Sequence, residues 1–411
     1  MARDVFVIGA FSTEFRKWPG KSFKQLSAEA FHGALADTGL STSLPVDSIW
    51  FANSGMGAWG QTSIRGQVAL GSLTAHTPII NVENACAGGG TAICGAWKDI
   101  LTGEAELSLA IGVEKLHFPD VDKGRVLEGM SAGIDNFDTE EWFKLYRTLD
   151  ETFHPKPGRS VFVDTSAARA RRHMREFGTT AEQIAAVCAK SHWYGARNPR
   201  AQYQFEIPAP VVLKDQVVNA PLTRAMCASP GDGAAAALLC SGEFLRALPE
   251  ATQRRAVRVE ACALAGGSPT ATIAAEKAYR RAGIGPGQID VAELHDSTSF
   301  CQIEQLEALG FCNLGEGASF DGVPVNTSGG LVSKSHPVAA TGISMLHELV
   351  EQLRGEAGSR QVDGAKNGLL YNAGGAIGLD DAVGCVVIVS RQIVASRFVR
   401  VSALEKEART A

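Results

Sequence analysis

Two stretches of the chain share one pattern, CAGGGTAICGAWKDILTGE (86–104) and HPVAATGISMLHELVEQLRGE (336–356). Each begins with a chemically reactive residue, passes through small residues and continues as a helical repeat that ends near a glycine. Such self-similarity indicates a duplicated unit. A duplication would place Cys86 and His336 at the N-termini of two related helices that face one cleft.

A second pair of stretches supports the duplication. Residues 228–241 (ASPGDGAAAALLCS) and 373–390 (AGGAIGLDDAVGCVVIVS) both run from a glycine-rich turn into an apolar strand. Elsewhere, strand-like and helical runs alternate, which predicts an α/β fold. Strands are expected at 5–10, 48–54 and 107–116, and helices at 22–39 and 86–103.

The composition changes between residues 117 and 222, where charged residues, aromatic residues and prolines are more frequent. This predicts an inserted region that covers the surface of the α/β core. The expected units are therefore an N-terminal half (1–116 plus 223–250), an inserted loop domain (117–222) and a C-terminal half (251–411).

Bulk properties exclude several classes of protein. The 411 residues carry a net charge of −5, which gives no electrostatic reason to expect nucleic acid or an anionic membrane as a partner. No stretch approaches the ~18 apolar residues of a membrane helix. The nine cysteines form no CxxC pair, so neither a zinc ribbon nor a thioredoxin-type site is indicated, and their odd number and scatter suggest reduced thiols in the cytoplasm.

Three further motifs contain residues suited to catalysis. VAELHDSTSF (291–300) predicts a strand with His295 at its C-terminal end, where α/β sheets build active sites. NTSGGLVSKSHPVAATG (326–342) places His336 between a glycine turn and a helix, and YNAGGAIGLDDAVG (371–384) is a second glycine-rich turn.

Together with the Cys86 segment, these motifs resemble the thiolase superfamily, especially its sterol-carrier-type, acetyl-CoA acetyltransferase-like branch. The resemblance spans nearly the whole chain. It implies two duplicated α/β halves in αβαβα layers with an inserted loop domain over the cleft. It also implies a homodimer core paired across a sheet edge, coenzyme A as a substrate, and no metal or organic cofactor.

The resemblance also implies a role for each site residue. Cys86 would be the acyl-accepting nucleophile and His336 would take its proton. Their surroundings would hold the thiol pKa near or below neutral. His295 would donate a hydrogen bond to the substrate carbonyl, and the backbone N–H groups of Cys86 and Gly374 would form a second oxyanion hole.

One departure affects the expected reaction. Many thiolases carry a second cysteine in the C-terminal glycine loop, as acid or base on the substrate α-carbon, and Asn372 occupies that position here. Sterol-carrier-type thiolases can place a cysteine directly after the HD pair, where this chain has Ser297. Ser297, Asn372 and Cys301 are the candidate substitutes.

The expected activity is thiolytic cleavage of a 3-oxoacyl-CoA, or the reverse condensation, through an acyl-enzyme on Cys86. The alternatives are a thiolase-like retro-aldolase acting on a β-hydroxyacyl-CoA and a non-catalytic acyl-CoA or lipid carrier. A small zinc-ribbon/OB-fold partner protein is a further hypothesis from the resemblance. The sequence identifies neither the acyl group nor the direction of reaction. The basic run 168–175 would either dock coenzyme A phosphates or form a solvated helix face.

Overall fold

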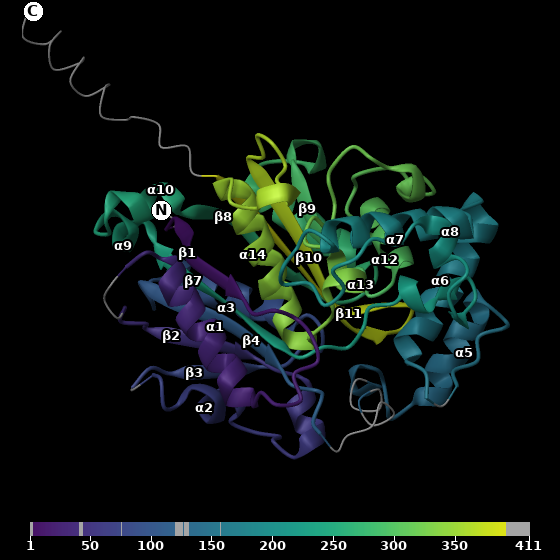
Figure 1. Ribbon diagram of the computed structural model, residues 1–411, viewed down its shortest axis with the longest axis horizontal. Helices are drawn as coiled ribbons and strands as arrows, with labels where there is room; N and C mark the ends of the chain where they lie inside the picture. The colour runs from purple at the N-terminus through teal and green to yellow at the C-terminus, as the bar shows by residue number, and fades with distance from the viewer. Residues whose placement is uncertain are drawn as a thin grey trace, which may run out of the picture.

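The computed structural model of the protein describes residues 3–40, 44–74, 76–119, 126, 131–156 and 158–391 (Figure 1). Its main feature is a nine-stranded sheet in the order β3-β2-β4-β7-β1-β8-β11-β10-β9. Among the described residues, no helix combines the length and the apolar character needed to cross a membrane.

The N-terminal half supplies five neighbouring strands of this sheet. They are β1 (Val5–Ser12), β2 (Ser48–Ala52), β3 (Ile79–Val82), β4 (Leu107–Glu114) and β7 (Gly233–Ser241). β2 runs parallel to β3 and to β4, whereas β7 runs antiparallel to both β4 and β1. Because β2, β4 and β7 are buried on both faces, their sequences are short apolar runs.

The C-terminal half repeats this arrangement with β8 (Val257–Ala265), β9 (Val291–Leu294), β10 (Asn367–Ile377) and β11 (Asp380–Arg391). β9 is parallel to β10, and β11 is antiparallel to β10 and to β8. A bridge from Ala292 to Val325 takes the place that β3 has beside β2. The matching order and direction of the strands confirm the predicted duplication.

The two halves meet where β1 pairs with β8, and together they enclose two helices, α3 (Gly88–Thr102) and α14 (Thr341–Arg354). One hydrophobic cluster joins these helices to strands of both halves. On the outer faces lie α1 (Phe23–Asp37) and α11 (Thr270–Ala282) with separate clusters. The strands of the two halves lie on opposite sides of α3 and α14, so that the one sheet provides two of five layers. This is the predicted αβαβα arrangement, and the strands and helices expected from the sequence are confirmed.

The segment between β4 and β7 leaves the main sheet. Its elements are η2 (Ser131–Gly133), α5 (Thr139–Leu149), α6 (Val161–Phe177), α7 (Ala181–Gly195), α8 (Ala209–Val212), β5 (Val217–Asn219), β6 (Leu222–Thr223) and η3 (Arg224–Met226). Among the described strands, β5 and β6 pair only with each other, whereas β4 and β7 pair directly. In Figure 1 the helices α5 to α8 lie to one side of the core, beside α12 (Ser299–Ala308).

Shorter elements complete the described part of the chain: η1 (Gly55–Trp59), α2 (Arg65–Leu70), α9 (Gly242–Arg246), α10 (Glu250–Arg255), η4 (Pro286–Gln288), η5 (Gly317–Ser319), α13 (Gly330–Lys334), η6 (Val338–Ala340) and η7 (Gly358–Arg360). The division at residues 117, 223 and 251 stays a prediction. Residues 120–125, 127–130 and 157 of the expected inserted domain, and 392–411 of the C-terminal half, lie outside the described residues.

Candidate active site

Cys86 lies between β3 and the N-terminus of α3. The glycines that follow it allow α3 to approach α14, because a Cβ on Gly89 would come within 2.9 Å of the carbonyl oxygen of Ala339. A Cβ on Gly374 would come within 2.3 Å of the backbone on either side of Cys86. The small residues around the cysteine therefore let three backbone segments converge at one sulfur.

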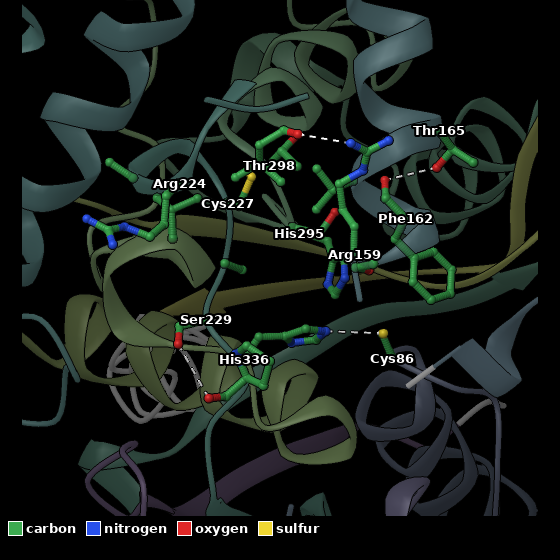
Figure 2. A pocket seen from close by; sticks show the side chains of 18 of the residues that line it. Cys86, Arg159, Phe162, Thr165, Arg224, Cys227, Ser229, His295, Thr298 and His336 are labelled. Atoms are coloured by element: carbon green, nitrogen blue, oxygen red, sulfur yellow. Dashed lines mark hydrogen bonds between the residues drawn. The ribbon is translucent and has the colours of Figure 1, made fainter. Parts of the chain in front are cut away.

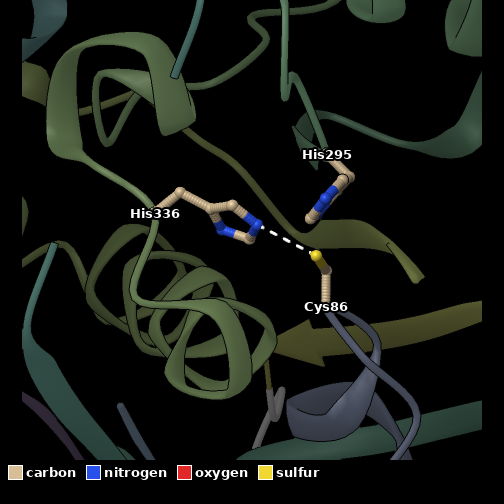
Figure 3. A group of neighbouring side chains, drawn as sticks. All are labelled: Cys86, His295 and His336. Carbon is tan, nitrogen blue, oxygen red and sulfur yellow. Dashed lines mark hydrogen bonds between the residues drawn. The ribbon is translucent and has the colours of Figure 1, made fainter. Parts of the chain in front are cut away.

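His336 is the partner of this sulfur. Its Nε2 lies 3.1 Å from Cys86 Sγ, and its Nδ1 lies 2.8 Å from Thr341 Oγ1 (Figure 3). The Thr341 hydroxyl donates to the carbonyl of Pro337 at 3.1 Å, so its oxygen accepts from the ring. This network assigns the proton of the neutral ring to Nδ1 and leaves Nε2 free to accept the thiol proton.

His295 follows β9 and lies beside the sulfur, with its ring centroid 5.0 Å from that of His336 (Figure 3). The Asn372 amide is oriented by two bonds: its oxygen accepts from the Gly90 N–H at 2.9 Å, and its nitrogen donates to the Cys86 carbonyl at 2.9 Å. That nitrogen also lies 3.3 Å from Nδ1 of His295. Nδ1 is therefore an acceptor, and the neutral ring carries its proton on Nε2.

The thiol of Cys86 is protonated at neutral pH in the substrate-free protein. Burial raises its pKa to about 12, and the negative charges of Glu114, Asp381 and Glu83 act in the same direction. The backbone N–H of Gly375 hydrogen-bonds to the sulfur and acts in the opposite direction. The expectation of a thiol pKa near or below neutral is therefore wrong, because burial and the nearby carboxyl groups both disfavour the thiolate.

Both histidines are neutral as well. Burial lowers the pKa of His336 to about 4. Burial, followed by the charge of His336, holds the pKa of His295 well below its usual value. The resting site is thus a neutral thiol beside two neutral imidazoles.

The three side chains open into a cavity of about 1070 Å³ (Figure 2). Its walls come from both halves and from the segment between β4 and β7, including Phe162, Phe205 and Ile207. Basic side chains also face it, from Lys17, Arg159, Lys214 and Arg224. A cavity of this size, with apolar walls and a few polar groups around a nucleophile, suits a large organic substrate.

Comparison with known families shows to which family the chain belongs. Residues 5–225 match the family described as thiolase, N-terminal domain, and residues 251–383 match the thiolase C-terminal domain-like family. The chain belongs to the thiolase superfamily. The resemblance proposed from the four motifs is thereby confirmed.

Individual relatives of this thiolase-family chain agree with that placement. It is 35% identical over 398 residues to an acetyl-CoA acetyltransferase of Methanothermobacter thermautotrophicus, covering 92% of this chain and 97% of the relative. It is 34% identical to sterol carrier protein 2 of Homo sapiens, covering 90% and 70%. It is 29% identical to the benzoylsuccinyl-CoA thiolase subunit BbsB of Thauera aromatica, covering 88% and 92%.

Two solved structures share the fold. The Ltp2-ChsH2(DUF35) aldolase has a TM-score of 0.75 at 22% identity, and human mitochondrial 3-ketoacyl-CoA thiolase has a TM-score of 0.66 at 18% identity. Each comparison covers 95% of this chain and 99% of the other chain. At these identities the likeness establishes the thiolase fold alone.

The structure brings most of the predicted site residues to the cavity. Cys86, His295, His336, Ser297 and Gly374 all line it. The roles assigned to them by resemblance, including the oxyanion hole at Gly374, remain predictions.

The other two candidate acid/base substitutes, Asn372 and Cys301, are not among the residues that line the cavity. Asn372 is fully buried and its amide is used in binding the backbone of the site. Cys301 is 3% exposed, and its sulfur faces the hydroxyls of Ser166, Ser297 and Thr298. Of the three candidate acid/base substitutes, only Ser297 faces the cavity in the substrate-free protein.

Sequence reasoning missed several residues of the site. Thr341 orients His336, and its only signal was its position in the ATG of the second motif. His117, His192 and Cys227 also line the cavity, and none of them belongs to the motifs that identified the site in the sequence. Arg169 also faces it, whereas Arg172 of the same basic run pairs with Glu176 on the surface of α6.

The three catalytic candidates also form a potential metal-binding group. One ligand atom from each of Cys86, His295 and His336 lies within 4.8 Å of the other two. Thiolate and imidazole are the ligands that Zn²⁺ prefers. Because the same atoms would be needed for acyl transfer, a bound metal would compete with that chemistry.

Proposed function

We propose that the protein is a thiolase-type acyl-CoA C-acyltransferase, acting by thiolytic cleavage of a 3-oxoacyl-CoA or by the reverse condensation. The observation that carries the proposal is the 3.1 Å contact between Cys86 Sγ and an Nε2 of His336 that can accept a proton. Its support includes the acetyl-CoA acetyltransferase and the benzoylsuccinyl-CoA thiolase subunit among the relatives.

In the cleavage direction, Cys86 Sγ attacks the 3-oxo carbon while its proton passes to His336 Nε2. The Nε2–H of His295 is available to hydrogen-bond an oxygen of the bound thioester. The Cα–Cβ bond then breaks; its electron pair stays with the departing acyl-CoA, and the α-carbon takes up the proton that His336 accepted from Cys86. The thiol of free coenzyme A finally attacks the acyl-enzyme and releases Cys86.

Coenzyme A is an anionic substrate, and the cavity offers positive charge. Lys17, Arg159, Lys214 and Arg224 line it, and the side chain of Arg224 is 69% exposed. Lys17, Lys214 and Arg224 are exposed and suit the phosphates of coenzyme A without fixing the acyl group, whereas Arg159 is half-buried and pairs with Asp164. No metal or organic cofactor enters the proposed reaction.

A retro-aldolase acting on a β-hydroxyacyl-CoA is the second candidate. Two observations favour it: Asn372 stands where many thiolases have their second cysteine, and a solved structure of the same fold is titled an aldolase. The pairing of Cys86 with His336 favours acyl transfer, because a retro-aldol cleavage needs no nucleophilic cysteine. The same pairing counts against the third candidate, a non-catalytic acyl-CoA or lipid carrier.

The proposal includes partners and a location. The outer edge of β3 is the sheet edge at which a homodimer core would form by family resemblance. A small zinc-ribbon/OB-fold partner is supported by the complex named in the aldolase title and by the word subunit in the name BbsB. A single chain type without zinc in the native complex would argue against the partner. All nine cysteines are free, which suits the cytoplasm.

Intact-protein mass spectrometry after mixing with a panel of acyl-CoAs tests the proposal. The wild type should gain an acyl mass, Cys86→Ala should gain none, and Cys227→Ala should behave as the wild type. Cys227 is a matched control because it is a free cysteine lining the same cavity. Full thiolytic turnover in Cys86→Ala would contradict the proposed acyl-enzyme. Cleavage of a β-hydroxyacyl-CoA by that variant would favour the retro-aldolase.

A further inference from the structure

One part of the cavity is polar although most of its walls are apolar. Tyr146 of α5, Thr165 and Arg169 of α6, and Asp381 of β11 all line it, and we call these four residues the polar wall. Three come from the segment between β4 and β7, and the fourth comes from the C-terminal glycine hairpin. None of them has a role in the acyl-transfer steps described above.

The guanidinium of Arg169 has few protein acceptors. Its Nη2 lies 3.6 Å from Glu304 Oε2 and 3.9 Å from Cys301 Sγ, distances too long for strong hydrogen bonds. Its buried Nε has no hydrogen-bond partner among the described residues, and the side chain is only 18% exposed. An arginine carries five N–H donors, and leaving them unsatisfied in a buried place is costly. The Nη donors of Arg169, for which no short hydrogen bond to a described residue is found, are therefore available to a ligand in the cavity.

Asp381 offers the complementary acceptor. Its Oδ2 accepts from the Tyr371 hydroxyl at 2.8 Å, which positions the carboxyl group. β11 pairs Asp381 with Ala376, the residue after Gly375, whose N–H hydrogen-bonds to Cys86. A rise of ~3.4 Å per residue and a spacing of ~5 Å between paired strands place the Asp381 Cα within about 9 Å of the Gly375 Cα. The polar wall thus lies near an acyl group carried by Cys86.

The local charge decides what kind of group fits. Arg169 interacts electrostatically with the carboxyl groups of Glu304 and Asp381, and Asp380 acts on both of those carboxyl groups, so acidic groups outnumber the guanidinium. Burial raises the pKa of both Glu304 and Asp381. A further carboxylate would add to this excess of acidic groups. A hydroxyl is neutral, and it can accept from Arg169 while donating to Asp381.

We propose that the polar wall selects an acyl-CoA whose acyl chain carries a hydroxyl group beyond the thioester, with Arg169 and Asp381 as its specificity-determining residues. Tyr371 acts through Asp381 and is a positioning residue. This inference rests on the proposed function for its substrate class, and it names the acyl group that the sequence left open.

Two matched series of thioesters test it: hexanoyl-, 6-hydroxyhexanoyl- and adipoyl-CoA, and butanoyl-, 4-hydroxybutanoyl- and succinyl-CoA. The rate of Cys86 acylation is followed by mass spectrometry. In at least one series the thioester with a terminal hydroxyl should acylate Cys86 about tenfold or more faster than the thioester with a terminal methyl. Only the hydroxyl can hydrogen-bond to both Arg169 and Asp381. Arg169→Met and Asp381→Asn should each bring this ratio close to one.

Arg172→Met is the matched control, because Arg172 lies on the same helix, is 48% exposed and pairs with Glu176 on the helix surface. It should keep the wild-type ratio. Arg169→Lys keeps the charge and shows whether loss of the fold explains the result for Arg169→Met. Equal acylation rates for the methyl-terminated and hydroxyl-terminated thioesters in both series would overturn the inference. So would fastest acylation by a carboxylate-terminated thioester.

Binding of the same esters to Cys86→Ala separates this inference from the proposed function. Cys86→Ala should bind the hydroxyl-terminated thioester more tightly than the methyl-terminated one, and the additional substitution Arg169→Met should abolish this difference. That result would support the polar wall even if the wild type forms no acyl-enzyme. Equal binding of all esters alongside efficient acylation of Cys86 would overturn the polar wall and leave the acyltransferase proposal standing.

Discussion

The side-chain amide of Asn372 donates to the backbone carbonyl of Cys86 at 2.9 Å, across 286 residues of sequence. The same amide accepts from Gly90 and lies beside His295. The Asn372 side chain thus links the backbone of Cys86 to the N-terminal turn of α3 and to the His295 imidazole.

Asn372→Ala should therefore reduce both stability and activity. It leaves the Gly90 N–H and the Cys86 carbonyl without this partner, at ~1–3 kcal/mol for each unsatisfied buried group. Chemical denaturation should show the loss. Asn367→Ala is the control, because that amide lies on the same strand and its bond to Gln288 is exposed. Equal losses of stability in Asn372→Ala and Asn367→Ala would contradict a special role for Asn372.

Thr341 should control the protonation pattern of His336. In Thr341→Val the ring loses its Nδ1 partner, and the proton can move to Nε2, where the ring can no longer accept from Cys86. Acylation of Cys86 should fall about tenfold or more, since a positioned base contributes ~10²–10⁴ to the rate. Thr341→Ser keeps the hydroxyl and should restore most of the rate. Failure of serine to do so would point to packing instead.

Alkylation of Cys86 should report its raised pKa. With a pKa of about 12, the thiolate fraction is very small at pH 7 and grows about tenfold per pH unit up to that value. The rate of modification by iodoacetamide, followed by peptide mass mapping, should rise steadily between pH 7 and pH 10. Free glutathione provides the reference for an ordinary thiol. A plateau below pH 8 would instead reveal a preformed thiolate–imidazolium pair.

Gly374→Ala should disrupt the site without a change of charge. The added Cβ would lie 2.3 Å from both Ala87 N and Asn84 O, so the hairpin and the cysteine loop must separate. Acyl-enzyme formation should drop strongly, because misplacement by about 1 Å can cost ~100-fold in rate. Gly287→Ala, where a Cβ meets nothing within 4 Å, is the matched control. Unchanged acylation in Gly374→Ala would contradict the packing described here.

Zinc ions should inhibit the enzyme reversibly. The ligand atoms of Cys86, His295 and His336 lie within 4.8 Å of one another and match the donors that Zn²⁺ prefers. Micromolar Zn²⁺ should lower the acylation rate, and a chelator should restore it. His295→Ala should weaken the inhibition, measured by titrating zinc against the remaining acylation rate. Undiminished inhibition in that variant would place the metal elsewhere.

Local patterns in the sequence determined much of this protein. The two glycine-rich helix starts at 86–104 and 336–356 predicted the duplication, and thereby the convergence of Cys86 and His336. This inference succeeds because a duplicated α/β unit repeats its strand order, so that equivalent helix N-termini face each other between the two halves. The position of His295 followed from the end of its strand in the same way.

The state of the site was decided only by tertiary structure. The pKa of Cys86 depends on burial and on Glu114, Asp381 and Glu83, two of which come from strands that its own motif does not specify. The structural role of Asn372 and the exposure of Arg169 to the cavity likewise depend on neighbours far away in sequence. Periodicity and glycine spacing report the backbone path, whereas desolvation and charge depend on every group that the fold brings within a few ångströms.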